Sequence, residues 1–166
     1  ALLDQALENS KNLFSTGEFI TKLGSLVNII TDSKNALSAY DLTSYYTDGL
    51  SDILADLGIQ TEIIDNPIKN APPFLIGKRI ESPELKTLLL YGHGDTVPLQ
   101  KDLWNDGINP RELKIFDEKI YGRGVADNKG QHLINLLALL SVLKTRKKLG
   151  FNVKIIFEMG EEVGSP

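Results

Sequence analysis

A short apolar run that ends in a glycine-flanked His-x-Asp motif constrains this chain more than any other feature. Thr87–Tyr91 is too short for a helix and has the composition of a buried strand. Gly92–Asp95 follows at once, and residues two apart on an extended backbone point the same way, so His93 and Asp95 share a face. The two glycines of the motif remove side chains that would block close approach from above. Because sites in α/β proteins lie where strands end, we expect one here.

Apolar spacing predicts the elements around this strand. Helical spacing is found over Thr16–Ile30, in one or two pieces between Leu37 and Leu57, and over Asn128–Lys144. Short β-favouring runs predict strands at Gln60–Asp65, Phe74–Ile80 and Val153–Phe157, and a hairpin at Leu113–Tyr121. Gly58 and Gly150 are expected to end the helices before them. A strand, a long helix and a strand in succession predict a βαβ-like unit, and therefore an α/β fold with three layers, an αβα sandwich around a mostly parallel or mixed sheet.

Composition narrows the class of protein. The 166 residues suffice for one domain with a real core, and we find no internal repeat, so residues 1–166 are interpreted as a single domain. A net charge of −4 gives no electrostatic basis for binding nucleic acid. The absence of cysteine excludes disulfides and thiolate metal sites. No apolar run is long enough to cross a membrane and no signal peptide opens the chain, so the expected location is the cytoplasm; the missing initial Met suggests trimming.

Three clusters of chemically capable residues lie at predicted element boundaries. His93 and Asp95 follow a strand, Asp127 precedes a helix, and Glu161 and Glu162 follow another strand. Imidazole and carboxylate ligands without sulfur suit zinc, cobalt or manganese. A carboxylate can bridge two cations, and a second carboxylate that binds no metal can act as a general base toward water. The histidine of such a site commonly has a carboxylate partner that fixes its tautomer, and Asp95 is placed for that.

Each cluster also has a less specific interpretation. An Asp before a helix is usually an N-cap, and a Glu-Glu pair on a surface is usually just solvated. The loop with Gly122 and Gly124 half resembles a dinucleotide-binding loop, but Asp127 stands where its third glycine would be and would repel a pyrophosphate.

Taken together, three motifs in this order are more specific. They are Gly-His-Gly-Asp-Thr-Val-Pro at 92–98, Tyr-Gly-Arg-Gly-Val-Ala-Asp-Asn-Lys-Gly at 121–130 and Glu-Glu-Val-Gly-Ser-Pro at 161–166. From about Leu88 to its last residue the chain resembles the co-catalytic zinc peptidases, a family that includes aminoacylase, carboxypeptidase G, acetylornithine deacetylase, succinyl-diaminopimelate desuccinylase and the carnosinase-type dipeptidases.

The resemblance implies a role for each residue of the motifs. It implies that His93 binds one metal ion, Glu162 binds the other and Asp127 bridges them. It further implies that Glu161 is the general base and that Asp95 orients His93. Arg123 and Lys129 are expected to be structural. His132 has no counterpart in the family motifs and is expected to be an ordinary helix residue.

The resemblance also implies what a complete protein would add. Family members carry a further acidic ligand, a late histidine and a lid domain that mediates dimerisation, and the only histidines here are His93 and His132. The chain is therefore interpreted as the N-terminal part of a phosphorylase/hydrolase-like catalytic domain whose parent forms a homodimer through the lid. Two divalent ions are implied, zinc first and cobalt or manganese next. With one of three ligands missing from each ion, we expect this piece to bind metal weakly or to leave the site empty.

The expected activity of the parent is metal-dependent hydrolysis of an amide bond in a dipeptide, small peptide or N-acyl amino acid. The 166-residue piece is expected to be inactive, with no nucleic-acid or membrane partner. One alternative is a non-enzymatic fragment with a vestigial site that acts as a binding or structural module. Another, less favoured, is a nucleotide-binding α/β domain.

Overall fold

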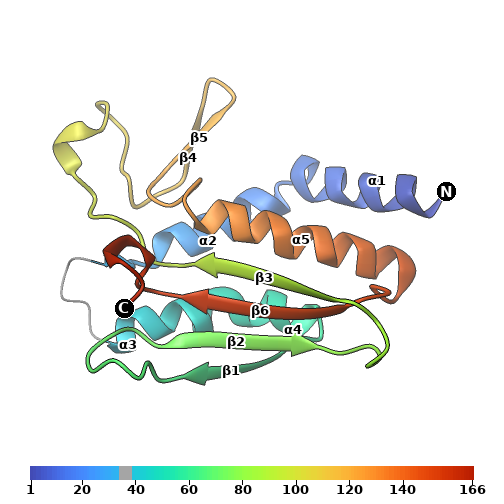
Figure 1. The fold of residues 1–166 in the computed structure, drawn as a ribbon. Coiled ribbons are helices and arrows are strands. Elements are labelled where there is room, and N and C mark those ends of the chain that lie inside the picture. The colour runs from blue at the N-terminus through green and yellow to red at the C-terminus, as the bar shows by residue number, and fades with distance from the viewer. Residues whose placement is uncertain (34–38) are drawn as a thin grey trace.

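The computed structural model describes residues 1–33 and 39–166 and has a mixed four-stranded sheet at its centre (Figure 1). In the order in which they lie side by side, its strands are β1 (Gln60–Ile64), β2 (Phe74–Arg79), β6 (Asn152–Glu158) and β3 (Thr87–His93). β3 and β6 are parallel, whereas β1 with β2 and β2 with β6 are antiparallel. The predicted α/β class with a mixed sheet is confirmed, and the sheet is not mostly parallel.

Helices and a small hairpin complete the described part of the chain. They are α1 (Leu2–Ser15), α2 (Glu18–Asn28), α3 (Ala39–Ser44), the π-helical turn η1 (Tyr45–Leu50), α4 (Ser51–Asp56), α5 (Lys129–Arg146) and the hairpin of β4 (Lys114–Phe116) and β5 (Lys119–Tyr121). The predicted helices, strands and hairpin are found within a few residues of their expected bounds. α1 was not predicted, and the part of the second helical prediction that falls on Leu37 lies outside the described residues.

The apolar pattern predicted α5 correctly, but the residue expected to end the helix was wrong. Its buried positions include Leu133, Leu136 and Leu140, and Lys144 and Arg146 lie in its last turn, where cations favour the helix dipole. The helix ends at Arg146, and Lys147, with a φ of 63°, caps it, so Gly150 is not the residue that stops it. A lysine therefore adopts the left-handed conformation that glycine usually supplies.

The hydrophobic core lies between the helices and one face of the sheet. Val153, Ile155 and Phe157 of β6 are at most 1% exposed and belong to one core cluster with the apolar side of α5. On the opposite face Leu89 and Tyr91 are exposed. The described residues therefore supply the sheet and one helical layer of the three expected layers.

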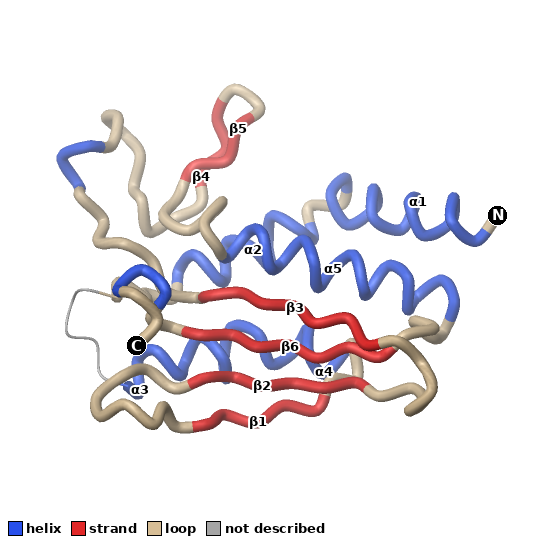
Figure 2. Tube along the Cα trace, viewed as in Figure 1, coloured by secondary structure: helices blue, strands red, loops and turns tan. Residues whose placement is uncertain are grey.

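The topology brings the ends of several elements to one place. Because β3 and β6 are parallel, with Gly92 opposite Phe157 and His93 opposite Glu158, their carboxyl ends lie at the same edge. Figure 2 shows this edge next to the short helical turn η3 (Glu161–Val163) and near the start of α5. The three clusters singled out in the sequence therefore converge at this edge.

Candidate metal centre

His93 lies at the centre of the convergent cluster. Its Nε2 atom is 3.1 Å from Oδ1 of Asp127 and 3.6 Å from Oε2 of Glu161. His93, Glu161 and Glu162 each offer a ligand atom, and these atoms lie within 4.8 Å of one another. Residues from the end of β3, the start of α5 and the turn after β6 thus face a common space.

Asp95 holds the other side of the His93 ring. The Nδ1 atom of His93 is 3.1 Å from the backbone oxygen of Asp95 and 3.3 Å from its Oδ1 atom. Burial of His93 opposes its charged form, but hydrogen bonds and the negative charge of Asp95, with a smaller contribution from Glu161, outweigh burial and raise the pKa of His93 to about 9. Asp95 lies where the orienting role implied by the sequence requires it.

Asp95 also anchors the glutamate turn, which sequence reasoning missed. The backbone N–H of Glu161 donates to Asp95 Oδ1 at 3.2 Å, and the N–H of Glu162 donates to Oδ2 at 3.0 Å. The Asp95 side chain is fully buried, so both of its oxygens are committed to the cluster. Only the tertiary fold, which brings two segments 66 residues apart together, reveals this link.

Asp127 is not the N-cap of α5, because Asn128 takes that position. The side chain of Asp127 is 70% exposed and directs Oδ1 toward His93. Its carboxylate is therefore available to a ligand and is not bound to the helix that follows it.

His132 is more than an ordinary helix residue, which corrects the sequence-based expectation. It is 2% exposed, and both ring nitrogens have partners: Nε2 meets the hydroxyl of Tyr45 at 2.5 Å and Nδ1 meets Oδ1 of Asn128 at 2.8 Å. Burial first, and then the positive charges of His93 and Lys129, lower the pKa of His132 to about 3, so its ring is neutral. The spacing of Asn128 and His132, one helical turn apart, was the signal available in the sequence.

Arg123 and Lys129 have the structural roles expected of them. The buried Nζ atom of Lys129 donates to the carbonyl oxygens of Leu26 at 2.9 Å and Ile29 at 2.8 Å, which joins the start of α5 to the end of α2. The guanidinium of Arg123 donates to the carbonyl oxygen of Pro98 at 3.3 Å and stacks 5.3 Å from the ring centre of Trp104. These contacts fix the loops that flank Asp127.

The open side of the cluster concentrates negative charge. Burial raises the pKa of the Glu162 carboxyl, and the charges of Asp127 and Glu161 raise it further, whereas His93 lowers it. Like charges held this close repel one another unless a cation lies among them. Carboxylate oxygens and an imidazole nitrogen are donors that suit zinc, cobalt or manganese, so the residues present fit a divalent ion.

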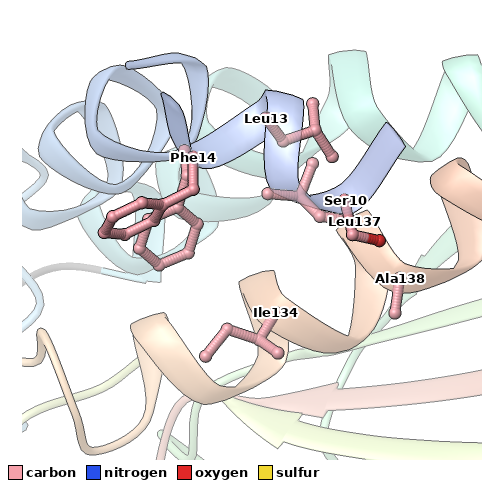
Figure 3. Close-up of a pocket in the computed structure, with 7 residues that line it drawn as sticks. Ser10, Leu13, Phe14, Ile134, Leu137 and Ala138 are labelled. Atoms are coloured by element: carbon pink, nitrogen blue, oxygen red, sulfur yellow. The ribbon is translucent and has the colours of Figure 1, made fainter. Parts of the chain in front are cut away.

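A second hollow lies away from this cluster. It lies between α1 and α5, and Leu13, Phe14, Ile134 and Leu137 are among the residues that line it (Figure 3). Its volume is about 280 Å³. The lining is apolar apart from Ser10 and offers no group suited to catalysis or metal binding.

Comparisons with known proteins cover the region that contains the three motifs. The model of peptidase family M20/M25/M40 matches residues 89–166, which contain all three motifs. The Beta-Ala-His dipeptidase of Mus musculus is 39% identical over 112 residues, which are 66% of this chain and 22% of that protein. The Cys-Gly metallodipeptidase DUG1 of Saccharomyces cerevisiae is 33% identical over 159 residues, 88% of this chain and 32% of that protein.

A solved structure extends the likeness to almost the whole chain. Human carnosine dipeptidase 1 superposes with a TM-score of 0.80 and 29% identity, over 99% of this chain and 36% of that one. This chain therefore shares the fold of the matching part of that dipeptidase. The chain belongs to peptidase family M20/M25/M40 and spans about a fifth to a third of the length of the curated relatives compared here. Among the described residues, the helices are all too short or too polar to cross a membrane.

Proposed function

We propose that this chain supplies the metal-binding part of an enzyme that hydrolyses the amide bond of a dipeptide with the help of divalent ions. The observation that carries the proposal is the convergence of His93, Asp127, Glu161 and Glu162 at one sheet edge. Family membership and the names of the relatives, which include a Beta-Ala-His and a Cys-Gly dipeptidase, support the substrate class. Longer small peptides and N-acyl amino acids are the alternative substrates, and an activity assay would distinguish them from a dipeptide.

Each residue of the cluster has a distinct role in this proposal. His93, Asp127 and Glu162 would hold the divalent ions, with Asp127 shared, and zinc is the first choice. Bound divalent ions polarise a carbonyl group and lower the pKa of water. The Glu161 carboxylate, with its side chain 44% exposed, takes the proton from the attacking water and returns it to the leaving nitrogen. Asp95 keeps His93 in the tautomer whose Nε2 faces the ions.

The decisive experiment is Glu161→Gln in the full-length parent, with β-Ala-His and Cys-Gly as substrates and metal content measured by elemental analysis. We expect turnover to fall by about 10²–10⁴-fold while metal content stays intact, because a general base contributes about that much. Asp127→Asn is expected to lose metal as well as turnover, and the exposed Glu84→Gln serves as a control that changes neither. Full turnover in Glu161→Gln would remove Glu161 from its role.

For the 166-residue chain itself we propose weak binding of divalent ions and no turnover. Its three proposed ligands, His93, Asp127 and Glu162, give each ion only two protein ligands when Asp127 is shared, whereas catalytic zinc sites commonly use three. Turnover with two tightly bound ions would contradict this. A nucleotide-binding role is disfavoured because the Asp127 carboxylate lies at the start of α5, where a phosphate would otherwise bind the helix N-terminus. The homodimer and the cytoplasmic location stay predictions for the parent.

A further inference from the structure

The segment that carries His93 lies directly on a floor of buried side chains. A Cβ atom added to Gly92 would lie 2.5 Å from the ring of Phe157 and 3.0 Å from Cβ of His132, and one added to Gly94 would collide with the ring of Tyr45. The two glycines therefore allow the strand end to pack closely on these buried side chains. The sequence had instead suggested that they keep the opposite side open for the close approach of a ligand. The backbone on both sides of His93 is in contact with this floor.

A chain of hydrogen bonds runs through the floor to the His93 backbone. The amide nitrogen of Asn128 donates to Gln131 at 2.7 Å, which leaves Oδ1 of Asn128 as an acceptor. Oδ1 accepts from the backbone N–H of His93 at 3.1 Å and from Nδ1 of His132 at 2.8 Å. Because Nδ1 carries the proton of a neutral ring, Nε2 accepts, and the Tyr45 hydroxyl donates to it at 2.5 Å. The donor and the acceptor of each hydrogen bond in this series are thereby assigned.

We propose that Tyr45, His132 and Asn128 are positioning residues that set the affinity of the site for divalent ions. The inference rests on the metal site proposed above. Asn128 is bonded covalently to Asp127 and by its side chain to the backbone of His93, so its carboxamide fixes the separation of these two ligands. Tyr45 and His132 in turn fix the carboxamide, since His132 donates to the same oxygen. Mutation of residues that hydrogen-bond to metal ligands typically weakens metal affinity by about 10–100-fold.

Tyr46 provides a matched comparison within the same π-helical turn. It is buried like Tyr45, with 2% and 0% exposure, and its hydroxyl also has strong partners. These are the carbonyl oxygens of Pro73 at 3.1 Å and of Phe157 at 3.0 Å, neither of which is a proposed ligand. A purely structural role predicts similar effects of losing either hydroxyl, whereas a positioning role predicts different ones.

The test compares Tyr45→Phe with Tyr46→Phe in the 166-residue chain. Cobalt(II) is titrated and followed by its visible absorption, and the melting temperature without metal is measured in parallel. We expect both variants to lose similar stability, but only Tyr45→Phe to weaken cobalt affinity, by about tenfold. We also expect faster hydrogen exchange of the His93 amide in Tyr45→Phe alone. Equal cobalt affinities in the two variants would overturn the positioning role while leaving the metal site in place.

A second pair of variants guards against a trivial folding defect. His132→Asn keeps a donor close to the position of Nδ1, whereas His132→Leu removes it, so we expect His132→Asn to bind cobalt more tightly than His132→Leu. Equal losses in both would contradict the relay through Asn128. If the unmodified chain bound no cobalt, zinc or manganese, the proposal that the 166-residue chain binds divalent ions would be overturned, together with the role of Tyr45 in that binding. This outcome differs from failure of the relay alone, in which the chain binds metal but the two tyrosine variants bind it equally.

Discussion

The two sides of the His93 ring are built on opposite principles. On one side of His93 lies a largely buried support formed by Asp95, Asn128, His132 and Tyr45. Tyr45, His132 and Asn128 are hydrogen-bonded in series to the His93 backbone, and Asp95 contacts the His93 ring and the glutamate turn. In front lies an acidic rim formed by Asp127, Glu161 and Glu162, with like charges held close together at the surface. The Asp95 side chain is 0% exposed, and that of Asp127 is 70% exposed.

This difference separates the part of the site that contributes to the stability of the fold from the part that a bound cation would stabilise. Buried polar groups that have partners contribute to stability, and removing one partner leaves the others desolvated and unbonded. The rim gains less from folding, because its carboxylates repel one another and, without a metal ion, only the charge of His93 offsets this repulsion. Changes in the support should therefore reduce both stability and metal affinity, whereas changes in the rim should reduce metal affinity alone.

The largest expected effect is that of Asp95→Ala. The change leaves the backbone N–H groups of Glu161 and Glu162 without their acceptor and removes the charge behind His93, so we expect a loss of about 3 kcal/mol in the free energy of unfolding. Urea unfolding of the metal-free chain measures it. Asp127→Ala is the matched change in the rim and should stay within about 0.5 kcal/mol of the original chain, although it loses metal affinity. Equal destabilisation by both variants would abolish the distinction between support and rim.

The pH dependence of stability should report the link between the support and His93. The pKa of His93 is about 9 in the folded chain and 6.5 in the unfolded chain, so the folded state binds more protons between these values. The resulting stabilisation is complete below pH 6.5, is lost as the pH rises toward 9, and amounts to at most about 3 kcal/mol. The difference between the original chain and His93→Gln isolates this effect, because other groups such as Lys129 titrate in both. A difference that is constant from pH 6 to 9.5 would contradict it.

The same two regions separate what the sequence could and could not reveal. The rim residues Asp127, Glu161 and Glu162 were singled out from motifs and element boundaries, because they stand next to turns, where side chains reach solvent. The strand before His93 and the helix after Asn128 were predicted from apolar spacing, and the structure confirms both elements.

Most of the support could not be found in this way, since the motifs pointed to Asp95 as the partner of His93 but gave no such role to Tyr45 or His132. Tyr45 and His132 are 87 residues apart, and both look like core residues of their own helices. Their pairing depends on how the turn η1 packs against α5, which no local pattern encodes. The double role of Asp95 likewise depends on the turn after β6 folding back over the end of β3. Local patterns thus indicate candidate ligands, and only tertiary contacts reveal the residues that would orient them.

The smallest expected effect is also the most direct test of the rim. Glu162→Gln removes one of the carboxylates that repel one another, so the metal-free chain should become more stable by about 0.5 kcal/mol at pH 7. With excess cobalt(II) the order should reverse, because a bound ion stabilises the folded chain in proportion to its affinity and Glu162→Gln binds it less tightly. Melting temperatures of both chains with and without cobalt measure this crossing. If the Glu162→Gln chain were less stable under both conditions, Glu162 would belong to the support and not to the rim. The boundary between the two regions would then lie closer to the surface than the burial of these residues indicates.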